Sequence, residues 1–137
     1  MIELINLWFK RAVPQPTPKN QAVQLGVHYE EVAEMALAMQ DHALADQLTQ
    51  WAASYKKHGA SMLDEVQDRK ELLDSLCDQI VTAVGLAHMY GLDINGALQE
   101  VNRSNWSKFV DGEPVFDDNG KIKKGPNYSP PELDKFV

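Results

Sequence analysis

The 137-residue sequence has a single cysteine, Cys77, which excludes an internal disulfide and is typical of a reducing cytoplasm. It has no apolar run of about 18 residues or more, so we expect no membrane-spanning helix. Positive charge is in deficit, with 13 Lys and Arg against 20 Asp and Glu and a net charge of −7. That balance argues against a surface for nucleic acid or for an anionic membrane. The N-terminal residues lack the small-residue cleavage site of a secretory signal.

The rest of the composition is that of a globular protein. Hydrophobic residues make up 44% of the chain and charged residues 24%, proportions that argue against wholesale disorder. The length suits one domain with one core. The acidic excess lies entirely within residues 1–102, because residues 103–137 carry equal numbers of acidic and basic side chains. The acidic part is therefore either a solvated surface or a site.

Apolar residues recur at helical spacing over most of the chain before residue 107. A proline-rich stretch, residues 14–18, ends the first predicted helix, and Gly59 ends the third. The fourth begins at an S-x-x-D signal at Ser61 and ends before Gly91, and Asp93 is placed to cap the fifth. The predicted helices span residues 2–12, 20–41, 43–58, 61–90 and 93–106.

Residues 111–137 differ in character, with four of the seven prolines and three of the eight glycines. Residues 114–124 predict a small β-hairpin, in which Asn119 and Gly120 supply the positive φ angles of the turn. The proline-rich end predicts a strap that lies over another surface. The expected fold class is all-α: a single domain, 1–137, in which a four- to five-helix bundle (about 1–110) carries the C-terminal β-hairpin and strap.

Acidic side chains form a first cluster on the second predicted helix. Glu31 and Glu34 share one face at i,i+3 spacing, and Glu30 lies one turn from Glu34. Taken alone, a solvated helix face explains this cluster, because like charges at such spacing cost only roughly 0.2–0.5 kcal/mol.

A second cluster, on the fourth predicted helix, is harder to explain as surface. Glu71, Asp74 and Asp78 lie on one face, and Asp78 interrupts an almost continuous apolar run, residues 72–87. We expect Asp78 to be buried, and a buried carboxylate without a partner neutralises rather than remains ionised. No Lys or Arg lies between Glu71 and Arg103 to pair with it. A cation supplied from outside would resolve this conflict.

Two helices that each offer two carboxylates predict an all-oxygen cage. Such a cage suits a hard cation, Mg²⁺ or Mn²⁺, that shares its ligands with substrate phosphates. A di-iron bundle site needs Glu-x-x-His motifs, and the sequence has none. The four histidines lack the mutual spacing of a zinc site, and Cys77 is most simply a small buried hydrophobic residue.

Four segments in order carry a family likeness. E-E-V-A-E at residues 30–34 precedes D-S-L-C-D at 74–78, and V-N-R-S-N-W-S-K at 101–108 and K-G-P-N-Y at 124–128 follow. This order resembles the all-α NTP pyrophosphohydrolase superfamily, which comprises the MazG-like proteins, phosphoribosyl-ATP pyrophosphatases and dimeric dUTPases. Over roughly residues 20–137 the chain is most similar to the small phosphoribosyl-ATP-pyrophosphatase-like proteins of bacteria and phages.

The resemblance implies a Mg²⁺ site, in which Mn²⁺ can substitute. The implied ligands are acidic side chains of the two clusters: Glu31, Glu34, Asp78 and either Asp74 or Glu71. The family pattern has an acid at the position of Ser75, and Asp74 is preferred over Glu71 because it lies one turn from Asp78. Glu30 is implied as a nearby acid, and Glu30 or Glu34 would accept a proton from the attacking water.

The implied reaction cleaves a nucleoside triphosphate to the monophosphate and pyrophosphate, with a weak lean to a deoxypurine such as dGTP. The implied phosphate ligands are Arg103, Asn105, Lys108 and Lys124. A solvated helix end is the alternative explanation of Arg103 and Lys108. Lys121 and Lys123 could add phosphate contacts, although a charged edge that keeps the hairpin soluble is the simpler explanation.

Aromatic side chains would stack on the nucleobase, and the candidates are Trp8, Phe9 and Tyr128, with Trp106 as a further one. Aromatic residues at a helix end are, however, more often part of a core. The resemblance also implies a homo-oligomer, a dimer or a tetramer, in the cytoplasm of a bacterial cell or a phage-infected host. The expected binding partner of the protein is its nucleoside triphosphate substrate, and we expect it to bind neither nucleic acid nor a membrane.

Two alternatives stay open. Among enzymes, the chain could be a phosphoribosyl-ATP pyrophosphatase of histidine synthesis. From a different class, it could be a non-catalytic helical interaction module whose acidic side chains are solvated. Such a module would bind no nucleotide and would show no thermal response to Mn²⁺.

Overall fold

The computed structural model describes residues 1–118 and 120–137. Over these residues the chain forms five α-helices, one short 3-10 helix and no β-sheet, so the all-α prediction is confirmed. The elements are α1 (Ile2–Ala12), α2 (Pro18–Ala38), α3 (His42–Met62), α4 (Arg69–Met89), α5 (Ile94–Trp106) and η1 (Asp134–Phe136). None of the described helices combines the length and the apolar character needed to cross a bilayer.

The chain divides into two compact units. The α4–α5 unit comprises Met1–Phe9, Glu65–Pro114 and Lys124–Val137, and the α2–α3 unit comprises Lys10–Asp64 and Val115–Lys123. The acidic cluster of α2 therefore belongs to one unit and the acidic cluster of α4 to the other.

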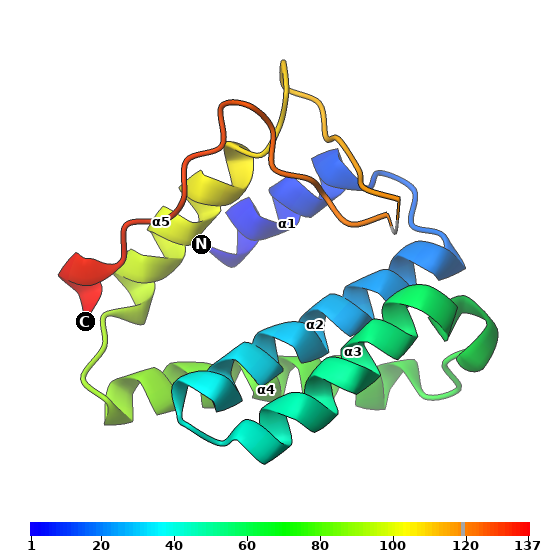
Figure 1. Cartoon of the computed structure of the whole chain (residues 1–137), viewed down its shortest axis with the longest axis horizontal. Coiled ribbons are helices and arrows are strands. Elements are labelled where there is room, and N and C mark those ends of the chain that lie inside the picture. The colour runs from blue at the N-terminus through cyan, green and yellow to red at the C-terminus, as the bar shows by residue number, and fades with distance from the viewer. Residues whose placement is uncertain (119) are drawn as a thin grey trace. The chain divides into compact units, whose positions relative to one another are not determined.

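Helices α2 and α3 form an antiparallel pair (Figure 1). Thr17 caps α2 in a capping box with Asn20, and the Asp41 side chain caps α3. The sequence predicts that α3 ends at Gly59, but the helix continues to Met62. The reason is tertiary: Gly59 is buried, and a Cβ there would lie 2.7 Å from the Cβ of Ala22 on α2. This glycine is thus a close-packing position rather than a helix stop.

Helix α4 begins later than predicted and is mostly exposed. Asp68, not Ser61, caps its N-terminus, while Gly91 follows its end with a φ of +73°, as a terminating glycine does. Within α4 the structure buries Ala87 alone. The expectation that Asp78 and Cys77 are buried is wrong, because both residues are exposed. The apolar run around them is not covered by described residues of the chain.

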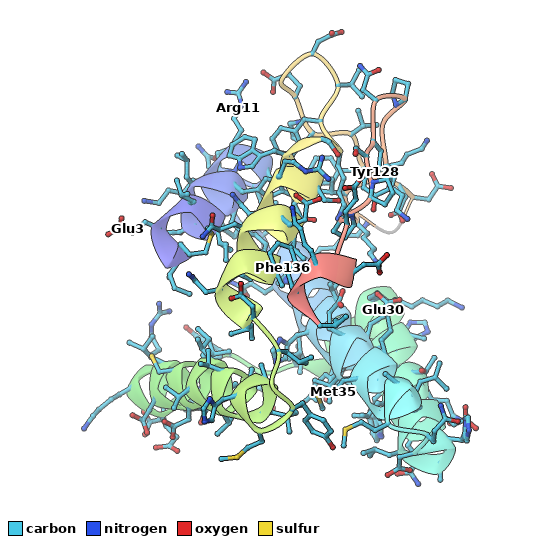
Figure 2. The ribbon with its side chains drawn as sticks, turned by 90° about the vertical axis from the view of Figure 1, so that its left-hand side faces the viewer. Glu3, Arg11, Glu30, Met35, Tyr128 and Phe136 are labelled. Atoms are coloured by element: carbon cyan, nitrogen blue, oxygen red, sulfur yellow. The ribbon has the colours of Figure 1, made fainter. Side chains whose placement is uncertain are left out.

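The C-terminal strap, residues 124–137, lies along α5 within the α4–α5 unit (Figure 2). The buried Ser104 hydroxyl donates to the Ser129 carbonyl at 2.8 Å, and the Ser129 N–H donates to Ser107 Oγ at 2.9 Å. At the far end the Asp93 N–H donates to the Phe136 carbonyl at 2.9 Å. These bonds satisfy backbone groups of a proline-rich segment whose one helix is the single 3-10 turn η1.

The predicted β-hairpin is wrong. In place of two strands, the described residues of 114–124 show one isolated antiparallel bridge, between Phe116 and Ile122. Between them the Asp117 carboxylate accepts the Lys121 N–H at 2.9 Å, and Gly120 has a φ of +81°. The turn role expected of Asn119 lies outside the described residues. Only a few residues stand on either side of this turn, and a hairpin so short is not stable as a sheet.

Candidate functional site

Helix α2 carries the first acidic cluster near its centre. Glu31 and Glu34 are exposed, and their i,i+3 spacing places both carboxylates on one face of the helix. Buried alanines hold the opposite face of α2 in its unit, and Ala33 is the nearest of them in sequence. The two carboxylates therefore project from a firmly packed helix.

Glu30, the remaining acid of this cluster, is bound by two lysines. Lys56 Nζ on α3 donates to Oε1 at 2.8 Å, and Lys121 Nζ in the C-terminal segment donates to Oε2 at 2.7 Å. Partial burial raises the pKa of the Glu30 carboxyl, but the bonds from Lys121 and Lys56 outweigh it, so the pKa lies below its ordinary value. Glu30, which Figure 2 labels on α2, is thus an ionised carboxylate with both oxygens occupied.

Helix α4 carries the second acidic cluster in its N-terminal half. Glu71, Asp74 and Asp78 are all exposed, and Glu71 also lies in the first turn, where a negative charge complements the helix dipole. Among the described residues, no group of three or more Asp, Glu, His or Cys side chains is gathered closely enough to hold a metal ion. The assignment of these acids as metal ligands stays a prediction.

The residues predicted to bind phosphate make contacts of their own in the α4–α5 unit. Lys108 Nζ donates to the amide oxygen of Asn105 at 2.7 Å, so the structure brings these two residues together. Arg103 binds the Glu100 carboxylate and donates to the Pro130 carbonyl at 2.9 Å, and in these contacts it holds the strap. Lys124 lies over the ring of Tyr128, 4.8 Å from its centroid.

The aromatic residues predicted to bind the base have different environments. Trp8 is only 8% exposed, with its ring 5.7 Å from that of Phe109 and 4.9 Å from that of Phe9. Trp8 is therefore a core residue, the alternative that the sequence leaves open. Its indole Nε1 is buried without a hydrogen-bond partner in the described residues. Phe9 is exposed and Tyr128 half-buried.

Sequence reasoning missed two features of the α2–α3 unit. One is Lys56, whose pairing with Glu30 depends on how α2 and α3 align and has no local signal. The other is an aromatic pocket lined by Tyr29, Leu48, Trp51 and Tyr55. The ring centroids of Tyr29 and Tyr55 lie 5.7 Å apart, and the two rings stack with an interplanar angle of 16°. The i,i+4 spacing of Trp51 and Tyr55, which puts two aromatic rings on one helix face, could have indicated this pocket.

Comparison with known families gives one finding. The family model described as phosphoribosyl-ATP pyrophosphohydrolase matches residues 4–105. Comparisons with curated proteins and with solved structures gave no match. The matched residues make up most of the chain and contain the acidic segments of both α2 and α4. The chain therefore belongs to the phosphoribosyl-ATP pyrophosphohydrolase family, a MazG-like, all-α family of the NTP-pyrophosphatase type.

Proposed function

We propose that the protein is a Mg²⁺-dependent pyrophosphohydrolase that converts a nucleoside or deoxynucleoside triphosphate to the monophosphate and pyrophosphate. The observation that carries this proposal is the family match, which spans the carboxylate-bearing faces of both α2 and α4. A deoxypurine triphosphate such as dGTP is the proposed substrate, and the cytoplasm, where free nucleotides occur, is the proposed location.

The donor set fits the metal that the family implies. Glu31 and Glu34 on α2, with Asp78 and Asp74 or Glu71 on α4, offer only carboxylate oxygens, the ligands that Mg²⁺ and Mn²⁺ prefer. When bound, such an ion neutralises phosphate oxygens and lowers the pKa of an attacking water. On each helix, carboxylates one turn apart repel one another, and a bound cation would relieve that repulsion.

The proton of the attacking water needs an acceptor on the protein. Both oxygens of Glu30 already accept a lysine hydrogen bond, which leaves that carboxylate poorly suited to the task. We assign the general base to Glu34, the exposed carboxylate one turn further along α2, and in this role Glu34 is left unligated by the metal.

Contacts to the phosphates come from the end of α5 and from the strap. Lys108 and Asn105 lie together, and they present an ammonium and an amide that suit phosphate oxygens. Lys124 adds a second ammonium at the start of the strap. Arg103 supports this arrangement through its bonds to Glu100 and Pro130, which anchor the strap to α5. Phe9 and Tyr128 are the proposed contacts to the base, because Trp8 is a core residue.

We also propose that the protein is a homo-oligomer in which α4 contacts a second copy. Leu72 and Val81 are 45% and 66% exposed and lie nine residues apart, on opposite sides of the helix. One neighbouring element covers one side of a helix, so apolar residues on two sides need two partners. Light scattering should give a dimer or tetramer for the wild type and a smaller species for Leu72→Gln/Val81→Gln. A monomeric wild type would contradict the oligomer.

A second candidate substrate is phosphoribosyl-ATP, which the description of the matching family names. One assay separates the two. Pyrophosphate release is measured with Mg²⁺ across the eight common NTPs and dNTPs and with phosphoribosyl-ATP, and Asp78→Asn serves as the inactive control. Turnover of a dNTP supports the first candidate, whereas turnover of phosphoribosyl-ATP alone, with rescue of growth in cells lacking that activity, supports the second. Absence of turnover on every substrate would refute both.

A further inference from the structure

Two ammonium groups converge on one carboxylate within the α2–α3 unit. Lys56 and Lys121 reach Glu30 from different elements, and 91 residues separate Lys121 from Glu30. The three side chains are partly exposed, at 21% for Lys56, 42% for Lys121 and 28% for Glu30. The cluster is accessible to a ligand and yet held by the fold.

The charge of this cluster is not balanced. One carboxylate neutralises one ammonium, so the group carries a net charge of +1. Joining the C-terminal segment to α2 requires a single ion pair, and a partly exposed pair stabilises a protein by only about 0–1 kcal/mol. A second lysine therefore adds little to folding but supplies a positive centre.

The position of the cluster indicates what it attracts. Glu30 lies one turn from Glu34 on α2, which puts the two side chains about 5–6 Å apart at Cβ. Each ammonium has three N–H donors, and each donates one of them to Glu30. The remaining donors can bind oxygen atoms of an anion at the acidic face, where Glu31 and Glu34 alone would repel it.

We propose that Glu30 is a positioning residue that holds the ammonium groups of Lys56 and Lys121 beside the acidic face of α2, where the two lysines bind the outer phosphates of the substrate. This inference rests on the proposed function, because it takes the substrate to be a triphosphate. It assigns Glu30 neither to the metal nor to proton transfer.

The test uses the full chain with inorganic pyrophosphate and excess Mg²⁺, and binding is measured by calorimetry. Lys56→Gln and Lys121→Gln should each weaken pyrophosphate binding about tenfold or more, since each removes a charge-assisted hydrogen bond. Lys57→Gln and Lys123→Gln are matched controls, because these exposed lysines neighbour the first pair in sequence and make no contact with Glu30 in the structure. Lys121→Arg should retain most of the affinity.

Glu30→Gln provides the sharpest discrimination. If Glu30 only repels phosphate, removal of its charge should strengthen pyrophosphate binding. If Glu30 positions the lysines, the same substitution should weaken binding severalfold. Stronger or unchanged binding by Glu30→Gln, or equal affinity in the Lys56 and Lys121 variants and their controls, overturns the inference.

A measurement on the wild type covers the case in which a variant fails to fold. Acetylation of surface lysines is followed by mass spectrometry with and without Mg²⁺-pyrophosphate. Protection of Lys56 and Lys121, but not of Lys57 and Lys123, supports the inference, and equal modification of all four overturns it. If the wild type hydrolyses a nucleotide while the lysine results are negative, the inference fails and the proposed function stands. A wild type that neither hydrolyses a nucleotide nor binds pyrophosphate refutes both.

Discussion

The guanidinium of Arg103 donates two hydrogen bonds to the carboxylate of Glu100, from Nε to Oε2 at 2.9 Å and from Nη2 to Oε1 at 2.7 Å. The same carboxylate accepts the Glu132 N–H at 2.9 Å, and Arg103 Nη2 donates to the Pro130 carbonyl. One ion pair on α5 thus organises the backbone of the strap, so its ionisation state should govern how firmly the strap is held.

The first prediction concerns acid stability. The bonds from Arg103 and from the Glu132 N–H lower the pKa of Glu100 from its ordinary value of 4.5 to about 2. A carboxyl with a lowered pKa in the folded state stabilises the fold above its ordinary pKa, and the contribution disappears as pH falls toward the folded value. At pH 6 the wild type should therefore have a higher Tm than the Glu100→Gln variant. This difference in Tm should disappear as the pH falls from about 4.5 to 2. Glu65→Gln, in the exposed loop before α4, should follow the wild type throughout; a constant gap for Glu100→Gln would contradict the prediction.

The second prediction concerns metal. If the acids of α2 and α4 bind a cation only in the folded state, Mn²⁺ or Mg²⁺ stabilises the protein by RT ln(1 + [L]/Kd), about 2.7 kcal/mol at a hundredfold excess over Kd. Millimolar Mn²⁺ should raise Tm by several degrees, and removal of the ion with a chelator should reverse the rise. Asp78→Asn should abolish most of it.

The control for this metal test is Asp64→Asn, which removes an exposed acid outside both clusters. Its response to Mn²⁺ should equal that of the wild type. A similar rise in Tm for Asp78→Asn and Asp64→Asn would remove Asp78 from the metal site.

The third prediction concerns the packing of α2 on α3. Gly59→Ala places a Cβ 2.7 Å from that of Ala22, a contact that forces the helices apart and should cost about 1–3 kcal/mol of unfolding free energy. Gly85→Ala on α4 meets no atom within 4 Å and should stabilise by about 0.5–1 kcal/mol through helix propensity. Urea unfolding of both variants measures the change in unfolding free energy, which should be a loss for Gly59→Ala and a gain for Gly85→Ala. A loss of stability in Gly85→Ala would contradict the prediction and show that other atoms fill the space around Gly85.

The fourth prediction concerns the buried indole of Trp8. A buried donor without a partner costs about 1–3 kcal/mol, so Trp8→Phe should unfold at an unchanged or higher temperature despite the smaller ring. Trp8→Ala, which also loses the packing against Phe109, should instead cost about 3–5 kcal/mol. Thermal unfolding distinguishes them. A marked loss in Trp8→Phe would mean that Nε1 has a partner, such as a bound water.

The fifth prediction concerns Lys108 and the phosphates. Lys108→Ala should weaken binding of a non-hydrolysable triphosphate roughly tenfold to a hundredfold, because it removes a charge-assisted hydrogen bond of about 1.5–3 kcal/mol. Binding of the monophosphate should change less, since the ammonium is expected to contact the outer phosphates. Lys57→Ala is the charge-matched control. Equal, small changes for both ligands would remove Lys108 from the site.

The sequence predicted those helix boundaries well that depend only on residues near them in the chain. The proline-rich stretch ends α1 at Ala12, Asp93 caps α5 and Gly91 adopts the positive φ that terminates α4. Each of these features depends on neighbours within a few residues, so the sequence contains the whole cause. The prediction that Gly59 ends α3 was wrong, because this glycine serves a packing contact with Ala22, which is distant in sequence.

The candidate site was less predictable for the same physical reason. The acidic clusters follow from helical spacing, but the pairing of Glu30 with Lys56 depends on the alignment of α2 and α3. The apolar run around Asp78 indicates burial, although no described part of the chain covers it. Periodicity reports that a face is apolar, and it does not report whether the chain itself or another molecule covers that face.

The three tryptophans are divided between the two units, so tryptophan fluorescence can report on each unit separately. Trp8 and Trp106 lie in the α4–α5 unit, whereas Trp51, 56% exposed, lies on α3 in the other. An indole in water emits at longer wavelength than one packed against aromatic rings, so Trp51→Phe should shift the native emission toward the blue. In that variant, loss of emission on unfolding follows the α4–α5 unit alone. A chain with Trp51 as its single tryptophan follows α2 and α3, and comparison of the two transitions tells whether the halves of the molecule melt as one.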